Sequence, residues 1–590
     1  MRRLYFLGFI AAFALYSAAS LMKTANAQSS SAKELVGLWE AKRRFGPDIR
    51  GTLLIRQSNG KWQAEIAGYF AQAKLDGDTI TFELTNGKGK FQGKFDARRT
   101  KIDGHWIQPA GVDNGAIASF VTLTKYRRDG WRGNVVPLDD TMTFYLMVKE
   151  RDDGSVGAFL RNPQRNLGWT RFRIDYLERK GETVKLFAAN KGSEKGRMLA
   201  EAVYRNEILT IQIPTRGGSY DFKRLNANDA TDFYPRGRPT ATYRYAPPPV
   251  LDDGWQTASL EDVGISRGAM EKFIQMLVDT PVDSVNSQED HGILIARRGK
   301  LVLEEYFHGE HRDKPHDTRS ASKSIASDLV GAAINSGAPI SPTDSVYQIM
   351  NGGEFPHDLE PRKRALTLEH LLTMSSGYDC DEGDPKSAGF EDNMWDQTDE
   401  PDFYKWTLAL KMMRAPGEKG VYCSAGSNLA GGVLARAAKQ TTQTLFHKLI
   451  AEPLGIRQYH LLISSAGDFT LTGGAQFLPR DFMKLGQVHI NGGTWNGRRI
   501  FTREWSSRAT SHRIDIGDRK YGYLWWINEY PYKGRNIRAY FAAGNGGQIV
   551  MAIPELDLVM AFYAGNYNDV GGLKAQNVYV PKYILPAIEN

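Results

Sequence analysis

A serine and a lysine three positions apart are the first residues in this chain that could do covalent chemistry. They stand in the segment Arg319-Ser320-Ala321-Ser322-Lys323-Ser324. The apolar spacing that follows, with Gly337 as a stop signal, predicts a helix over residues 320–335. On a helix, residues three apart share one face, so the hydroxyl of Ser320 and the amine of Lys323 can touch. The predicted chemistry is nucleophilic attack by an activated serine.

The charge of Lys323 decides how it could help. An ordinary lysine is neutral only about 0.04 % of the time at pH 7. Lys323 therefore either loses its charge through burial or keeps it and assists a separate base. The same spacing is also expected if Ser320 simply caps the helix and Lys323 is solvated. Further residues are needed to distinguish a catalytic pair from this alternative.

A tyrosine supplies the second catalytic candidate. Tyr422 follows the turn-forming pair Pro416-Gly417 and precedes an apolar helix predicted over residues 429–438. A lysine cation close to this phenol would favour its deprotonated form. Tyr422 is thus a candidate partner of Lys323 in moving the serine proton, although simple packing is the alternative for one loop tyrosine.

A glycine-rich bend supplies the third candidate. The segment Gly544-Asn545-Gly546-Gly547-Gln548 leads into an apolar strand. Glycines at a strand edge let a ligand approach the backbone closely. The N–H of Gln548 could then pair with that of Ser320 to form an oxyanion hole. The alternative is an ordinary bend with no contact to substrate.

These three elements, in this order, resemble the serine β-lactamase and penicillin-binding-protein superfamily. The resemblance covers about residues 255–590 and is strongest to the class C β-lactamase-like branch, which includes esterases, D-amino-acid-specific peptidases and nylon-oligomer hydrolases. The segments 366–377 and 521–526 also look like signatures of that family. The resemblance implies an acyl-enzyme mechanism with Ser320 as nucleophile and Lys323 and Tyr422 as proton carriers, and it requires no metal or cofactor.

Two departures from the family pattern bear on the substrate. Ser424 stands where a β-lactamase has the asparagine of Tyr-x-Asn, and Asn545 stands where it has the lysine of Lys-Thr-Gly. Without that lysine, the carboxylate of a penicillin or peptide loses an attractive charge. We therefore expect a small ester or amide as substrate. The alternatives are a D,D-peptidase or β-lactamase acting on cell-wall-like substrates, and a catalytically idle receptor for a peptide or wall fragment.

The chain divides into four predicted parts. Residues 1–27, with two arginines, an apolar run and the site Ala25-Asn26-Ala27, have the layout of a secretory signal peptide. Residues 31–235 carry strand-like runs joined at turns such as Asn59-Gly60, which predicts an all-β barrel or sandwich. Residues 236–252 read as a stiff Pro-rich linker. Residues 253–590 are predicted to form an α+β catalytic domain of the β-lactamase type, its antiparallel sheet built from both ends of the segment, with flanking helices and a helical subdomain.

Charge, hydropathy and cysteine content indicate which binding partners and which cellular compartment to expect. The formal net charge is +8 over 590 residues, and the basic residues are scattered, so nucleic-acid binding has no support. Removal of the signal peptide would give a periplasmic or secreted protein, because no later stretch is long and apolar enough to span a bilayer. The alternative is that residues 4–21 remain as an uncleaved membrane anchor. Cys380 and Cys423 are the only cysteines. Export permits a disulfide between them, but two separate thiols remain the alternative, because the Cα separation decides.

Overall fold

The computed structural model describes residues 32–111, 115–164, 172–189, 196–226, 232–238, 240–568 and 570–589. The predicted signal peptide lies outside these residues. The chain forms two compact units. The first comprises Met1–Phe45, Thr141–Ala241 and Val278–Glu289, and the second comprises Gly46–Asp140, Thr242–Leu277 and Asp290–Asn590.

The first unit is all-β. Its strands form one nine-stranded sheet in the order β12-β11-β10-β1-β17-β16-β15-β14-β13. Alternating burial along these strands places Trp39, Phe144, Leu209 and Phe222 in one apolar core. The bounds are β1 (Gly37–Gly46), β10 (Asp140–Glu150), β11 (Val156–Arg161), β12 (Phe172–Ile174), β13 (Tyr176–Lys180), β14 (Thr183–Ala188), β15 (Arg197–Arg205), β16 (Ile208–Ile213) and β17 (Gly218–Arg224).

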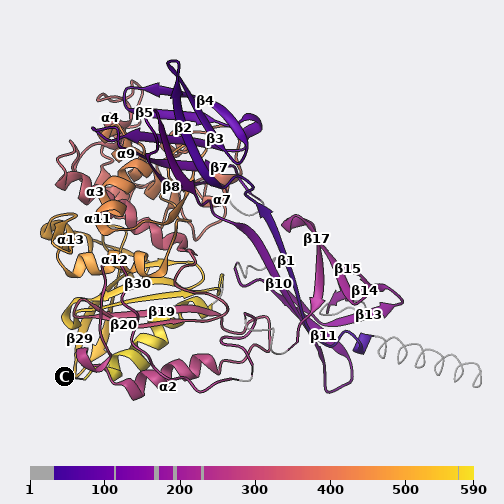
Figure 1. Cartoon of the computed structure of the whole chain (residues 1–590). Coiled ribbons are helices and arrows are strands. Elements are labelled where there is room, and N and C mark those ends of the chain that lie inside the picture. Colours follow the sequence, from indigo (N-terminus) through magenta and orange to yellow (C-terminus); the bar gives the residue numbers. More distant parts are fainter. Residues whose placement is uncertain are drawn as a thin grey trace, which may run out of the picture. The chain divides into compact units, whose positions relative to one another are not determined.

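The second unit begins with a closed barrel of the eight strands β2 to β9, drawn in dark violet in Figure 1. The barrel closes because β9 pairs with both β2 and β8. As predicted, β2 and β3 meet at Asn59-Gly60, where both residues have positive φ. The bounds are β2 (Gly51–Ser58), β3 (Lys61–Ile66), β4 (Tyr69–Asp76), β5 (Thr79–Glu83), β6 (Lys90–Phe95), β7 (Lys101–Gln108), β8 (Ala116–Lys125) and β9 (Gly130–Val135).

The barrel is joined by a shared sheet to the α+β part that the sequence predicted to be catalytic, called the catalytic part below. Strand β8 pairs with β22 (Tyr459–Ile463), which continues through β23 (Gln476–Phe477) to β21 (His316–Asp317), just before Ser320. Buried side chains reinforce the junction, since Ser119 Oγ lies 2.8 Å from His460 Nδ1. The sequence predicted a single all-β domain over residues 31–235, whereas the structure assigns the two halves of that segment to different units. The reason is a pairing between strands more than 300 residues apart, which no local pattern reveals.

Two tyrosines of the Pro-rich segment predicted as a linker are buried and hydrogen-bonded. Residues 240–250 are extended without helix or strand, but Tyr243 and Tyr245 are buried. The backbone N–H of Tyr243 donates to Gln275 of α2 (Arg267–Val278), and the hydroxyl of Tyr245 donates to the carbonyl of Val302 at 2.8 Å. The segment is thus a strap on the catalytic part, because its tyrosines have found partners there.

The catalytic part contains a second nine-stranded sheet, in the order β18-β20-β19-β31-β30-β29-β28-β27-β26. Its strands come from both ends of the segment, as predicted, and Figure 1 shows β19 and β20 beside the yellow β30. Helix α12 packs on β30 and β31. The strands are β18 (Gln256–Thr257), β19 (Asp290–Arg297), β20 (Lys300–Tyr306), β26 (Ile514–Ile516), β27 (Arg519–Tyr521), β28 (Trp526–Tyr532), β29 (Arg535–Gly544), β30 (Gln548–Ile553) and β31 (Leu558–Ala564), with a separate small hairpin of β24 (Thr494–Trp495) and β25 (Arg498–Arg499).

Helices make up the rest of the catalytic part. The helix predicted over residues 320–335 is present as a 3₁₀ turn at Arg319–Lys323 followed by α3 (Ser324–Asn335), which is almost entirely buried because Ile325 and Leu329 lie in the core. The other helices are α4 (Val346–Met350), α5 (Pro361–Arg364), α6 (Leu368–Leu372), α7 (Glu391–Asp396), α8 (Phe403–Ala409), α9 (Ser424–Ala438), α10 (Thr442–Phe446), α11 (Glu452–Leu454), α12 (Pro479–Ile490) and α13 (Arg503–Ala509). The predicted α+β domain with an N-terminal barrel is therefore confirmed.

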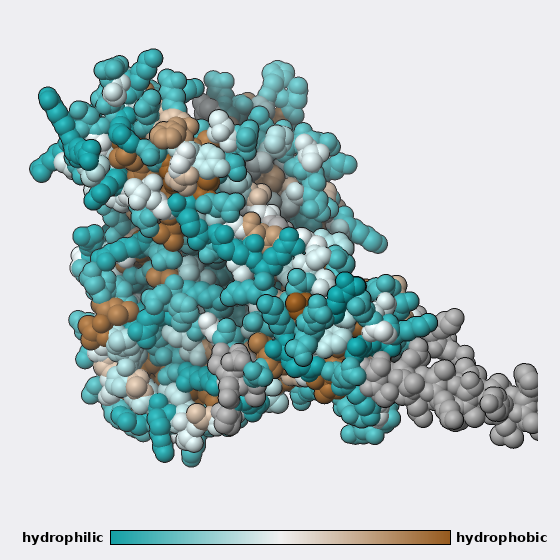
Figure 2. Space-filling view, turned by 45° about the vertical axis from the view of Figure 1, so that its right-hand side comes forward, coloured by the Kyte–Doolittle hydropathy of each residue, from teal (hydrophilic) through white to brown (hydrophobic). Residues whose placement is uncertain are grey.

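The surface of the protein is mainly polar on the face shown in Figure 2. Figure 2 shows a face that is mainly hydrophilic, with small, separate hydrophobic patches. Within the described ranges, no helix has both the length and the apolar character needed to cross a bilayer.

Candidate active site

The structure brings Ser320 and Lys323 into direct contact. Lys323 Nζ lies 3.0 Å from Ser320 Oγ, within hydrogen-bonding distance. The same ammonium group also donates to the backbone carbonyl of Thr472. Lys323 is 1 % exposed, while Ser320 remains partly accessible. The contact follows from the local fold, since a 3₁₀ turn places residues three apart above one another.

Tyr422 completes the cluster from a distant part of the chain. Its ring centroid lies 5.2 Å from Lys323 Nζ. The ring of Tyr422 also stacks on that of Trp526, with centroids 5.7 Å apart and an interplanar angle of 19°. Tyr422 lies two residues before α9, on the loop where the sequence predicted it. The three predicted catalytic residues therefore share one site.

The two supporting motifs border this site and hold Tyr422. In the segment 366–377, the carbonyls of Met374 and Ser375 accept hydrogen bonds from Val421 N and Gly417 N, both at 2.8 Å. The segment 521–526 contributes Trp526. The turn predicted at Pro416-Gly417 is thus fixed on both sides, which gives the phenol a defined position.

The groups around Lys323 favour its charged form. Burial by itself would lower the pKa of Lys323, but Tyr422, Glu391 and Glu382 outweigh it, and the pKa is raised above its usual value. Of the two ways in which the sequence allowed Lys323 to act, the structure favours the ammonium ion that assists a separate base. Tyr422, whose ring centroid lies 5.2 Å from Lys323 Nζ, is the candidate for that base.

The backbone around Ser320 is closely packed between two glycines. Arg319, directly before the serine, has a left-handed φ of 48°. A Cβ on Gly473 would lie 3.2 Å from Ser320 N, and one on Gly544 would lie 3.1 Å from Ala321 N. Both positions therefore need glycine, because the approach leaves no room for a side chain. Sequence reasoning included Gly544 in the glycine-rich bend but passed over Gly473, although the pair Gly473-Gly474 was a visible signal.

Gly544→Ala should damage the site selectively. The added Cβ would stand 2.3 Å from the carbonyl oxygen of Thr318, which forces the start of the Ser320 segment to move. We expect kcat/KM for an ester to fall roughly a hundredfold, the scale of a 1 Å misplacement. Gly268→Ala is the matched control, because a Cβ there meets nothing within 4 Å. Equal activity of both variants would contradict the close approach.

Gln548, predicted to contribute its backbone N–H to an oxyanion hole, is the first residue of β30. It is fully buried, and its side-chain amide donates to the carbonyls of Ala564 and Asn545. The reason is register: β29 and β30 pair Gly544 with Gln548, so residues 545–547 form the turn and Gln548 starts the neighbouring strand. Gly547 packs against Ala564 within that turn. Gly544 is the residue that contacts the Ser320 segment.

Asn545 and Ser424, the other two predicted substrate residues, differ in their surroundings. Asn545 is exposed, and its side chain exchanges two hydrogen bonds with Asn568, at 2.7 and 2.8 Å. Ser424 is fully buried at the first turn of α9, and its hydroxyl donates to Glu391 at 2.9 Å. The hydroxyl of Ser424 is thus already engaged in a hydrogen bond within the protein. The sequence showed only that a serine replaces the family's asparagine and did not indicate this contact.

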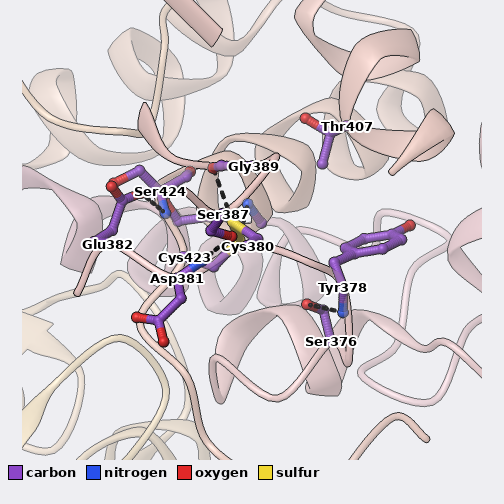
Figure 3. Close-up of a disulfide and its surroundings, with 12 residues drawn as sticks. Ser376, Tyr378, Cys380, Asp381, Glu382, Ser387, Gly389, Thr407, Cys423 and Ser424 are labelled. Carbon is purple, nitrogen blue, oxygen red and sulfur yellow. Dashed lines mark hydrogen bonds between the residues drawn. A yellow bond between two sulfur atoms is a disulfide. The ribbon is translucent and has the colours of Figure 1, made fainter. Parts of the chain in front are cut away.

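The two cysteines form a disulfide. Cys380 and Cys423 are joined, with their Cα atoms 5.4 Å apart, and Figure 3 shows the bond between the loop after residue 377 and the start of α9. The sequence left open whether the two cysteines are bonded or are separate thiols, and in the structure they are bonded. The bond lies one residue after Tyr422, so it ties a loop directly to the catalytic candidate.

Fold and site together define a serine β-lactamase-like domain, with an antiparallel sheet flanked by helices and a serine, a lysine and a tyrosine at one point. Comparison with known proteins agrees. Residues 288–575 match the family model described as Beta-lactamase. This part of the chain belongs to the serine β-lactamase and penicillin-binding-protein superfamily, as its motifs predicted.

The individual proteins that this chain resembles have low sequence identity to it. A 6-aminohexanoate-dimer hydrolase of Paenarthrobacter ureafaciens is 25 % identical over 218 residues, which is 35 % of this chain and 54 % of that protein. The chain thus spans about half the length of this curated relative. Among solved structures, a penicillin-binding-protein homologue from Caulobacter crescentus is 17 % identical and covers 50 % of this chain and 91 % of its own, with a TM-score of 0.40. A family VIII carboxylesterase is 16 % identical and covers 57 % and 98 %, with a TM-score of 0.41.

Proposed function

We propose that this chain is a serine hydrolase that cleaves an ester or a small linear amide through an acyl-Ser320 intermediate. The observation that carries the proposal is the 3.0 Å contact between Lys323 Nζ and Ser320 Oγ, with Tyr422 against the same lysine. A serine hydroxyl attacks a carbonyl only when a neighbouring group removes its proton. This cluster provides such a group at a partly accessible serine.

The reaction follows from the positions of these groups. Ser320 Oγ attacks the carbonyl carbon, and its proton passes to the Lys323–Tyr422 pair and then to the leaving group. Water releases the acyl group by the reverse proton transfer. For the oxyanion we assign the backbone N–H groups of Ser320 and Asn545, because Gly544, directly before Asn545, lies against the Ser320 segment. Gln548 is replaced in this role.

Two polar residues that the sequence assigned to substrate binding support the choice of substrate. Asn545 brings no positive charge to the place where a β-lactamase has lysine, so a substrate carboxylate gains no partner there. Ser424 is engaged with Glu391 and is not free to hold a peptide amide. The name of the curated relative, a 6-aminohexanoate-dimer hydrolase, is consistent with a linear amide.

A covalent probe and a substrate panel test the proposal. We expect a fluorophosphonate to add one adduct to the wild-type protein, located by mass spectrometry on Ser320, and none to Ser320→Ala. We expect p-nitrophenyl esters or small amides to be hydrolysed and nitrocefin to be a poor substrate. Faster turnover of nitrocefin or a D-Ala-D-Ala peptide would favour the D,D-peptidase or β-lactamase alternative. Absence of any adduct, with equal ligand binding by Ser320→Ala, would favour the idle receptor.

We also propose that the protein is exported to the periplasm or beyond the cell. The amino-terminal 27 residues support this, and so does the Cys380–Cys423 disulfide, because such bonds persist mainly in oxidising compartments. Recovery of the protein from the cytoplasmic fraction, with residues 1–27 still attached, would contradict export.

A further inference from the structure

One segment of the catalytic part contacts both Lys323 and the backbone of Ser320. It comprises residues 470–475 and is named the bridging segment. The carbonyl of Thr472 accepts a hydrogen bond from Lys323 Nζ. Gly473 follows, and a Cβ added to it would lie 3.2 Å from the backbone nitrogen of Ser320. The bridging segment therefore sets where the amine of Lys323 stands relative to the serine that it contacts.

The bridging segment is also tied to the helix that follows Tyr422. The backbone N–H of Leu471 donates to Asn428 Oδ1 at 3.2 Å, and the carbonyl of Leu471 accepts from the Ser427 hydroxyl at 2.9 Å. Both of these side chains belong to α9, and both residues are buried. Elements that carry all three catalytic candidates therefore meet at this one segment.

On its other side, the bridging segment lies against the strand that pairs with the barrel. The backbone N–H of Thr470 donates to the carbonyl of Leu462 in β22 at 2.9 Å, and a Cβ added to Gly474 would lie 3.1 Å from the Leu462 side chain. Strand β22 in turn pairs with residues 116–119 of β8, with Leu462 opposite Ile117. Figure 1 shows β8 on the side of the barrel that meets the helices. The bridging segment is thus supported by a strand that the barrel holds in place.

The pairing of β8 with β22 is buried and belongs to the core of the catalytic part. Ala118 of β8 is fully buried in the same apolar cluster as Ile325 and Leu329 of α3, the helix that begins directly after Lys323. Ser119 and His460 lie opposite each other, 1 % and 2 % exposed, with Oγ 2.8 Å from Nδ1. Because such an interior is close-packed, a shift of β8 is transmitted to β22 and is not absorbed between them.

We propose that the barrel is a positioning element for the hydrolytic reaction, and that Ser119 and His460 are its positioning residues. Through β22 and the bridging segment, the barrel holds the Thr472 carbonyl at the place where it directs Lys323 Nζ toward Ser320 Oγ. The barrel contributes none of the three catalytic candidates, so its part in the reaction is to support the residues that do contribute. This inference rests on the proposed function.

Ser119→Ala tests this role from outside the active site. The change removes the hydroxyl that lies 2.8 Å from His460 Nδ1 and leaves the backbone pairing of the two strands in place. A loosened bridging segment would hold Lys323 less firmly against Ser320. We therefore expect kcat for an ester and the rate constant of fluorophosphonate labelling to fall by roughly three- to tenfold, a fraction of the cost of a 1 Å misplacement, with KM unchanged. Ser119→Thr keeps a hydroxyl and should restore most of both rates.

Labelling of Ser320 separates positioning from stability. The final amount of adduct counts the molecules with a folded site, whereas the rate constant of labelling reports on each folded site. Val121→Ala is the matched control, because Val121 lies on the same strand in the barrel core but pairs with Gly104 of β7 and not with β22. Its truncation should lower the urea midpoint and leave both rates unchanged.

Two outcomes overturn the positioning role: rates for Ser119→Ala that equal those of the wild type, and an equal loss of rate in Val121→Ala. If the wild type is labelled and hydrolyses the ester, either outcome contradicts only the role of the barrel. A wild-type protein that shows neither labelling nor hydrolysis contradicts the proposed function, and the positioning role is then rejected with it.

Discussion

Tyr422→Phe and Lys323→Met are each expected to lower kcat/KM for an ester by more than about a hundredfold, the usual contribution of a general acid–base group. Tyr422→Phe keeps the ring that stacks on Trp526 and removes only the hydroxyl. Lys323→Met keeps most of the buried volume but removes the group that lies 3.0 Å from Ser320 Oγ. Initial rates with a p-nitrophenyl ester, over a range of concentrations, give kcat and KM separately.

The loss should fall on kcat. Neither variant removes the pocket or the backbone N–H groups near Ser320, so substrate can still bind. Tyr521→Phe is the control for the tyrosine, because Tyr521 packs edge-on against the same Trp526 with ring centroids 4.6 Å apart. Its hydroxyl has no role in the proposed reaction, and its rate should change little. Unchanged kcat in Tyr422→Phe or Lys323→Met would remove that residue from the mechanism.

The contact between Ser320 and Lys323 could be predicted from the sequence because its signal is local. Ser320 and Lys323 face each other through the geometry of a single turn, and the helix that carries them was visible in its apolar spacing. Tyr422 lies on a loop before a helix, as the turn residues before it indicated. What brings Tyr422 to Lys323 is long-range packing, and it was inferred from a resemblance and not from the residues alone.

Which residue of the glycine-rich bend completes an oxyanion hole depends on strand register. The run of residues 544–548 contains three glycines, and a shift of a few positions changes which residue meets Ser320. The structure places the turn at residues 545–547 and Gly544 against the serine. The number of residues in a hairpin turn depends on how both strands pair. The sequence could therefore locate the bend but not which of its residues contacts the Ser320 segment.

The division of the amino-terminal β region was beyond sequence reasoning for a similar reason. Its strands and their turns were predicted, but the pairing of β8 with β22 depends on a segment more than 300 residues away. The same limit applied to the cysteines. Their spacing of 43 residues allowed a bond or two free thiols, and only the Cα separation of 5.4 Å decides.

Removing the disulfide with Cys380→Ser and Cys423→Ser is expected to lower the free energy of unfolding of the catalytic part by about 4 kcal/mol, from the chain-entropy estimate for a loop of this length. Urea unfolding followed by tryptophan fluorescence measures the change. Dithiothreitol should shift the wild-type midpoint toward that of the double variant and leave the double variant itself unchanged.

The same change should reduce activity below the unfolding transition. Without the bond, Tyr422 is still held by Glu382 N at its carbonyl and by the stack on Trp526, so the site is loosened and not lost. We therefore expect kcat to fall by roughly tenfold, less than for loss of the hydroxyl itself, because part of the orientation of Tyr422 survives. A variant with normal kcat and a lowered midpoint would show that the bond stabilises the loop without positioning Tyr422. A variant with a normal midpoint would contradict the link between the disulfide and the stability of this loop.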